Sequence, residues 1–110
     1  MDSIQDFTNY THFSPQEAAY QFTSVIEASK AGKGGAYVRV PVNIKEYFGK
    51  GRLKVRVYFE MVYYEGSIVN MGVKNPDGSV CYILGVRKDI RKELNKDIGD
   101  TLTVSFQPVF

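Results

Sequence analysis

The residue types that most often carry catalysis are scarce in this chain, and their positions do not favour a reaction. The only histidine, His12, lies in a polar N-terminal stretch, where a solvated surface residue is favoured over a catalytic base. The only cysteine, Cys81, stands between Val80 and Tyr82 in a predicted strand, which favours a buried inert thiol over a nucleophile. One histidine and one cysteine cannot supply a four-ligand zinc site. We therefore predict no catalytic residue, no metal and no cofactor, and an enzyme is the third choice of function.

Two glycine-rich segments resemble phosphate-cradling loops in composition only. These are Gly32-Lys33-Gly34-Gly35 and Gly49-Lys50-Gly51-Arg52. Neither lies between a strand and a helix, and neither ends in the Lys-Ser/Thr pair of a P-loop. The pattern favours plain turns.

The feature that points to a function is the distribution of basic and aromatic side chains. The net charge is only +2, but residues 33–56 contain seven basic residues and one acidic residue, and residues 87–96 contain five basic and two acidic ones. Arginine and lysine contact phosphates, and tyrosine can stack on bases. The predicted binding surface consists of Arg39, Lys50, Arg52, Lys54, Arg56, Arg87, Lys88, Arg91, Lys92, Tyr37 and Tyr58.

This surface predicts a non-enzymatic binding module for nucleic acid or another acidic partner. The sequence pI of about 8.6 is lower than that of strongly basic nucleic-acid-binding domains. The alternative is a protein-interaction or self-association module, a possible homo-oligomer, that uses exposed aromatics such as Tyr63 and Tyr64. A small-ligand-binding barrel or an enzyme is the third choice of function.

The composition also predicts the location of the protein. No apolar run is long enough to span a bilayer, and no basic and apolar leader precedes the domain, so we expect no membrane contact. A single cysteine cannot form an internal disulfide, and the expected location is the cytoplasm.

The elements that must position the basic residues follow from the hydrophobic pattern. The run 53–60 alternates apolar and polar residues, which predicts a half-buried strand. Asn43 and Glu46 have the spacing of a helix N-cap and its third residue, and Ile44 and Phe48 give that helix one apolar face. The predicted elements are strands 20–29, 37–42 and 53–60 with helix 43–48, then strands 62–70, 79–86 and 101–107 with helix 87–95, and a turn at 75–78.

The two halves of this pattern have the same order of elements, strand, strand, helix, strand. A three-stranded sheet with one short helix leaves an apolar face exposed to water, so neither half is expected to be stable alone. We predict a mainly β protein with two short helices: a six-stranded β-barrel built from two ββαβ halves related by a pseudo-two-fold. The expected organisation is a loose arm over residues 1–16 and one barrel domain over 17–110, with pseudo-repeats at 20–60 and 62–107. An ordinary β-sandwich is the alternative.

The order of several segments resembles the domain-of-unknown-function family nineteen-oh-five over about residues 20–107. The resemblance implies a double-split β-barrel, distantly similar in architecture to the AbrB/MazE group, and it implies no activity. The segments that carry it are Val40-Pro41-Val42 and residues 49–57, 66–72, 82–92 and 98–104.

Overall fold

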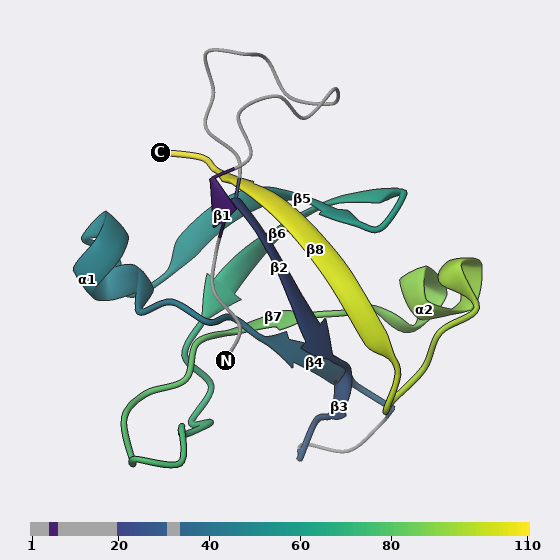
Figure 1. The fold of residues 1–110 in the computed structure, drawn as a ribbon, viewed down its shortest axis with the longest axis horizontal. Helices are drawn as coiled ribbons and strands as arrows, with labels where there is room; N and C mark the ends of the chain where they lie inside the picture. The colour runs from purple at the N-terminus through teal and green to yellow at the C-terminus, as the bar shows by residue number, and fades with distance from the viewer. Residues whose placement is uncertain (1–4, 7–19, 31–33) are drawn as a thin grey trace.

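The elements predicted in both halves are present in the computed structural model, which describes residues 5–6, 20–30 and 34–110 (Figure 1). The helices are α1 (Ile44–Phe48) and α2 (Lys88–Leu94). The strands are β1 (Gln5–Asp6), β2 (Tyr20–Val25), β3 (Glu27–Ala28), β4 (Ala36–Arg39), β5 (Leu53–Phe59), β6 (Val62–Val69), β7 (Ile83–Gly85) and β8 (Thr101–Pro108).

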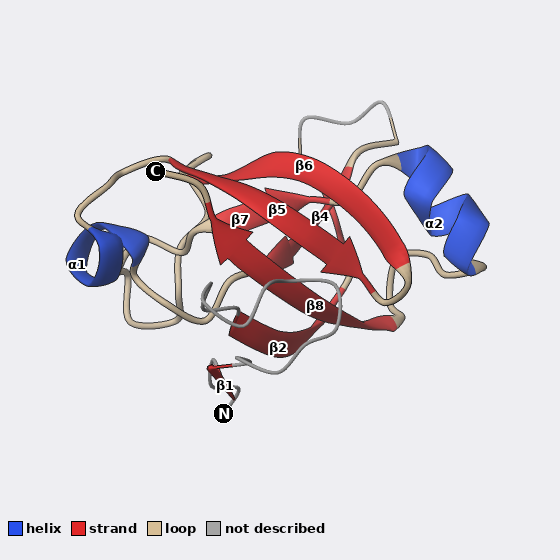
Figure 2. Ribbon diagram, turned by 90° about the horizontal axis from the view of Figure 1, so that it is seen from above, coloured by secondary structure: helices blue, strands red, loops and turns tan. Residues whose placement is uncertain are grey.

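The strands form one antiparallel sheet in the order β1-β2-β8-β5-β6-β7-β4-β3, which curls into a nearly closed barrel (Figure 2). Closure depends on Ile26, which separates β2 from β3 and is 1% exposed. Its N–H donates to the Asp100 carbonyl at 2.9 Å, and its carbonyl accepts from the Gly99 N–H at 2.8 Å. Because the chain bends here, β2 pairs with β8 while β3 pairs with β4, and one stretch joins both ends of the sheet.

The mainly β class with two helices is confirmed, but the prediction of six strands is wrong. The sheet has eight strand segments, because β1 pairs with β2 and because Ile26 divides the predicted strand 20–29. The predicted strand 79–86 shrinks to the three residues of β7. Before β7 the chain makes the predicted turn, in which the Gly78 N–H donates to the Asn75 carbonyl, and only an isolated bridge joins Lys74 to Val80.

The barrel interior is built from alternate residues of the longest strands. The apolar residues of β5 are fully buried, and its polar residues point outward, as the alternation predicted. Val57 of β5 lies opposite Phe106 of β8. These positions belong to the core, which contains Leu53, Val55, Val57, Phe59, Leu102, Val104 and Phe106, each 0% exposed.

The two helices lie at opposite ends of the barrel (Figures 1 and 2). Asn43 caps α1, since its Oδ1 accepts from the backbone N–H groups of Lys45 and Glu46 at 3.1 and 3.2 Å. Asn95 ends α2 in the left-handed conformation with φ 56°, which asparagine tolerates at a helix end. The start of α1 and the end of α2 therefore lie where local sequence signals place them, whereas Arg87 begins α2 without a side-chain cap.

The turn between β5 and β6 contains Glu60 and Met61, which are not the usual residues of a tight hairpin. It is nevertheless a two-residue turn, with Phe59 paired to Val62. Glu60 has a φ of 55°, and its Oε2 accepts from the Thr103 N–H at 2.8 Å. The carboxylate therefore ties the turn to β8.

We expect Glu60→Ala to lower the free energy of unfolding by about 1–2 kcal/mol, because the Thr103 N–H loses its acceptor while the left-handed conformation stays costly. Glu60→Gly also loses the acceptor but relieves the backbone, so its loss should be smaller. Urea unfolding measures both. Equal losses in the two variants would show that the positive φ of Glu60 has no cost.

Candidate functional site

A groove forms on the barrel where β6 and β7 separate. Their pairing is confined to two positions, Ile68 with Leu84 and Val69 with Ile83. From there β6 runs along β5 to the turn at residues 60–61, while the chain after β7 enters α2. The groove between them has a volume of about 1180 Å³. We call it the α2 groove; its walls are β6 on one side and the β3–β4 loop, β4, β7 and α2 on the other.

The α2 groove brings together part of the predicted binding surface. Four of the basic residues come from the start of α2 and its first turns, and one comes from the residue before β5. The predicted residues that line it are Tyr37, Arg52, Arg87, Lys88, Arg91 and Lys92.

Five predicted residues lie outside the groove: Arg39, Lys50, Lys54, Arg56 and Tyr58. Lys54 and Arg56 are exposed on the outer face of β5, where Arg56 lies opposite Glu65. Lys50 is exposed between α1 and β5. The outer face of β5 is therefore a separate basic surface.

Arg39 and Tyr37 are held by the same carboxylate. The Arg39 Nε lies 2.6 Å from Glu27 Oε2, and the Tyr37 hydroxyl donates to Glu27 Oε1 at 3.3 Å. The Tyr37 side chain is 6% exposed, and its burial, with the Glu27 charge as the next cause, raises its pKa. Tyr37 therefore contributes little open ring surface to the groove.

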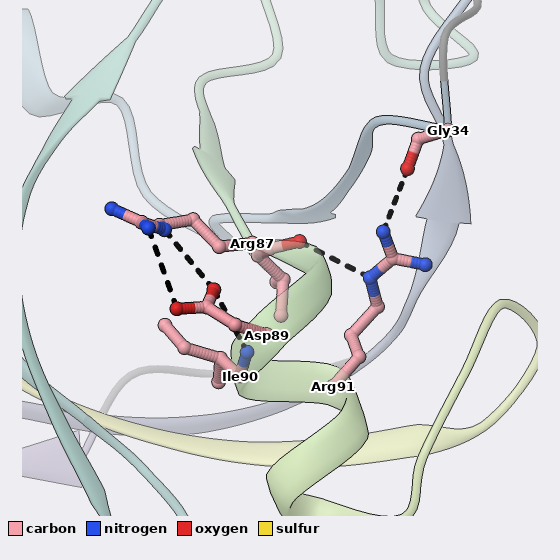
Figure 3. A network of polar contacts seen from close by, with 6 residues as sticks. Gly34, Arg87, Asp89, Ile90 and Arg91 are labelled. Carbon is pink, nitrogen blue, oxygen red and sulfur yellow. Dashed lines mark hydrogen bonds and ion pairs between the residues drawn. The ribbon is translucent and has the colours of Figure 1, made fainter.

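Arg91 is buried and acts as a cross-link rather than as a surface cation (Figure 3). Its Nη2 donates to the Gly34 carbonyl at 2.7 Å, its Nε to the Val86 carbonyl at 3.3 Å, and its Nη1 to Asp97 Oδ1 at 2.8 Å. The Ile98 backbone N–H and then the Arg91 guanidinium lower the pKa of Asp97. Arg91 thus fixes α2 to the β3–β4 loop and holds that side of the groove in place.

Arg87 is placed over an aromatic ring by an exposed ion pair. Its Nε and Nη2 lie 3.1 and 3.3 Å from the two carboxylate oxygens of Asp89 (Figure 3). Its guanidinium carbon is 5.9 Å from the centroid of the Tyr64 ring, which permits a cation–π interaction. Both members of the pair are more than half exposed, so water screens the pair and a phosphate can exchange with Asp89.

The remaining cations of the groove are Arg52, Lys88 and Lys92, and all three are exposed. Within the described part of the chain none of these three side chains forms a hydrogen bond or an ion pair, although the charge of Lys88 helps to lower the pKa of Asp97. Lys88 and Lys92 are four residues apart and therefore project from one face of α2. These side chains can pair with an external anion without breaking an internal contact.

Sequence reasoning missed the residues that β6 and β7 contribute to the groove. Glycine inside a strand often marks a bulge or a close backbone approach, and the pairing of Gly66 with Val55 in an unbroken register excludes the bulge. The close approach is internal, because a Cβ at Gly66 would lie 2.6 Å from the Tyr64 ring. Gly85 also lines the groove. The glycines were visible signals, but the separation of β6 from β7 was not.

The aromatics proposed for self-association fall on different faces. Tyr63 is 45% exposed beside Tyr58, with ring centroids 5.1 Å apart, whereas Tyr64 is half-buried against the core and in the α2 groove. Self-association through these residues stays a prediction.

The structure supplies no alternative centre for chemistry in its described residues. Cys81 is buried and free, as predicted, and desolvation raises the pKa of its thiol. No three His, Cys, Asp or Glu side chains in the described ranges gather to hold a metal ion. No described helix has the length and apolarity needed to cross a membrane. His12 and the rest of the predicted arm, except β1, lie outside the described residues.

Comparison with protein families agrees with the resemblance found in the sequence. The family model described as Domain of unknown function (DUF1905) matches residues 22–106. This range includes both helices and every described residue that lines the α2 groove. The comparison with curated proteins gives no match.

Proposed function

This chain belongs to the DUF1905 family of domains of unknown function, and from that premise we propose that it is a non-enzymatic module that binds nucleic acid in the α2 groove. Another acidic partner is the broader version of the same proposal. The family description assigns no activity, so the proposal depends on the groove itself. A cytoplasmic location, in which nucleic acid is accessible, is part of the proposal.

The observation that carries this proposal is the set of exposed cations around one groove whose side chains form no hydrogen bond or ion pair with the described residues. Arg52, Lys88 and Lys92 can each neutralise a phosphate, and Arg87 can do so by leaving Asp89. The Tyr64 ring lies in the same groove and offers a surface for stacking. Phosphate contacts would supply affinity, and stacking would supply contact with any base.

The test is a salt titration of binding to fluorescein-labelled single-stranded DNA of mixed sequence, followed by fluorescence anisotropy. Three or four phosphate contacts predict a slope of log K against log salt of roughly −2 to −3. Absence of binding at low salt would refute the proposal. If poly-glutamate competes with DNA at an equal charge concentration, the site recognises acidic polymers in general.

We also propose that the chain arose by duplication of one ββαβ unit, with a pseudo-two-fold relating the halves. The strand pairing supports this proposal. The first strand of each half pairs with the last strand of the other half, as β2 with β8 and β6 with β5. The middle strands β4 and β7 pair with each other, as do the last strands β5 and β8. Under this symmetry Gly66, opposite Val55, corresponds to Phe22, opposite Val104.

A further inference from the structure

We infer that the α2 groove takes a single nucleic-acid strand rather than a duplex, and that Gly85 keeps the base of the groove open for that strand. This inference rests on the proposed function and deepens it by naming the form of nucleic acid. It follows from Gly85, which lines the groove at the end of β7, because the fold does not explain why this residue is a glycine.

Gly85 has no conformational or packing reason to be glycine. It is the last residue of β7, where it pairs with Tyr37, and its φ is not in the left-handed region. A Cβ built on it would meet nothing within 4 Å, and the residue is exposed. Glycine within a strand costs roughly 0.5–1 kcal/mol relative to alanine, and it often marks a place where a ligand approaches the backbone closely.

Two other glycines that line the groove have structural explanations, which distinguishes them from Gly85. The ring of Tyr64 packs against Gly66, so a Cβ added at Gly66 would lie 2.6 Å from that ring. Gly34 has a φ of 76°, and its carbonyl accepts from Arg91. The bare backbone at Gly85 therefore lines the groove and has no other structural role.

The arrangement around Gly85 fits a single strand. The cations Arg52, Lys88 and Lys92 and the Tyr64 ring line the same groove as Gly85. A strand lying on Gly85 can extend phosphates to the lysines and turn a base to the ring, because its bases are unpaired. A duplex keeps its bases stacked inside, so it would meet the exposed cations without using the ring or the bare backbone.

The opposite end of the barrel shows what happens when the corresponding position is filled. Phe22, which corresponds to Gly66 under the proposed symmetry, is 3% exposed and packs against Phe106 at 6.2 Å between ring centroids. Phe48 of α1 lies 5.7 Å from Tyr20 and 6.5 Å from Phe106 by the same measure. Aromatic side chains occupy that end, whereas at Gly66 the neighbouring Tyr64 ring lies directly against the glycine.

The experiment compares Gly85→Val with wild type for binding to a labelled single-stranded 12-mer and to the duplex of the same sequence. The added side chain meets open space and valine favours strands, so thermal unfolding should show a midpoint at or above that of wild type. We expect wild type to prefer the single strand and Gly85→Val to raise its Kd at least about tenfold, the scale of one lost base stack. The weaker duplex binding should be unchanged.

Gly51→Val is the matched control, because Gly51 also has open space around it, has no left-handed φ and does not line the groove. It should bind like wild type. If Gly85→Val binds the single strand as tightly as wild type, or if wild type binds the duplex equally well, the inference is overturned while the proposed function stands. If wild type binds neither form, both fail. Should Gly85→Val not fold, Gly85→Ala replaces it, and unchanged binding by that variant also overturns the inference.

Discussion

Arg91→Ala is expected to lower the free energy of unfolding by roughly 2–3 kcal/mol, one of the two largest effects that we predict. Its guanidinium makes three hydrogen bonds, and the residue is only 6% exposed. Alanine leaves the buried Val86 carbonyl without this donor and opens a void under α2. For a domain of this size the corresponding decrease in Tm is roughly 10 °C or more, which thermal unfolding followed by circular dichroism measures.

The neighbouring residue provides the control for this prediction. Lys92→Ala removes the same charge from the same helix, but Lys92 is exposed and has no described partner, so its effect should stay within about 0.5 kcal/mol. Arg91→Lys keeps the charge and lacks the planar fork that reaches Gly34, Val86 and Asp97 together, so it should resemble alanine more than wild type. If the Arg91 and Lys92 variants unfold alike, Arg91 is not a cross-link.

The double variant Lys88→Glu with Lys92→Glu is expected to weaken binding of single-stranded DNA on the order of 100-fold at low salt. Each substitution removes a phosphate contact and adds a repulsive carboxylate to the α2 groove. The salt dependence should change as well. Loss of two contacts predicts a slope of log K against log salt that is shallower by about 1.4.

Lys50→Glu with Lys54→Glu changes the net charge equally and lies outside the α2 groove. It should weaken binding only through the general field of the protein, by a few-fold, and leave the slope unchanged. Equal losses in the two double variants would mean that the whole basic surface binds and that the groove has no special role. Circular dichroism confirms that both variants fold.

The sequence showed many of the residues of the candidate site, but it did not show that they lie together around one groove. The basic residues of α2 were predicted from the concentration of basic charge in residues 87–96, and Lys88 and Lys92 are exposed while Ile90 and Leu94 pack toward the core. Arg91 was assigned to the same surface, yet it is buried, because the Gly34 carbonyl and Asp97 lie within its reach only in the folded chain.

The residues of β6 and β7 illustrate the same limit. Tyr64 was considered an exposed aromatic, and Gly85 drew no attention. Their roles depend on where the two strands separate, and strand alternation is identical on both sides of that point. A nonlocal pairing that stops after two residue pairs leaves no periodic signal in either segment.

The sequence by itself determined both helices and the strand β5 of this protein, because caps, glycines and apolar alternation act between residues close in the chain. Asn43 marks the start of α1, and Asn95 marks the end of α2. The alternation of residues 53–59 sets which side chains of β5 enter the core. Only the tertiary structure decided that the sheet bends at Ile26 into a barrel and opens a groove beside α2. Those features come from pairings between residues tens of positions apart, and local propensity carries no information about them.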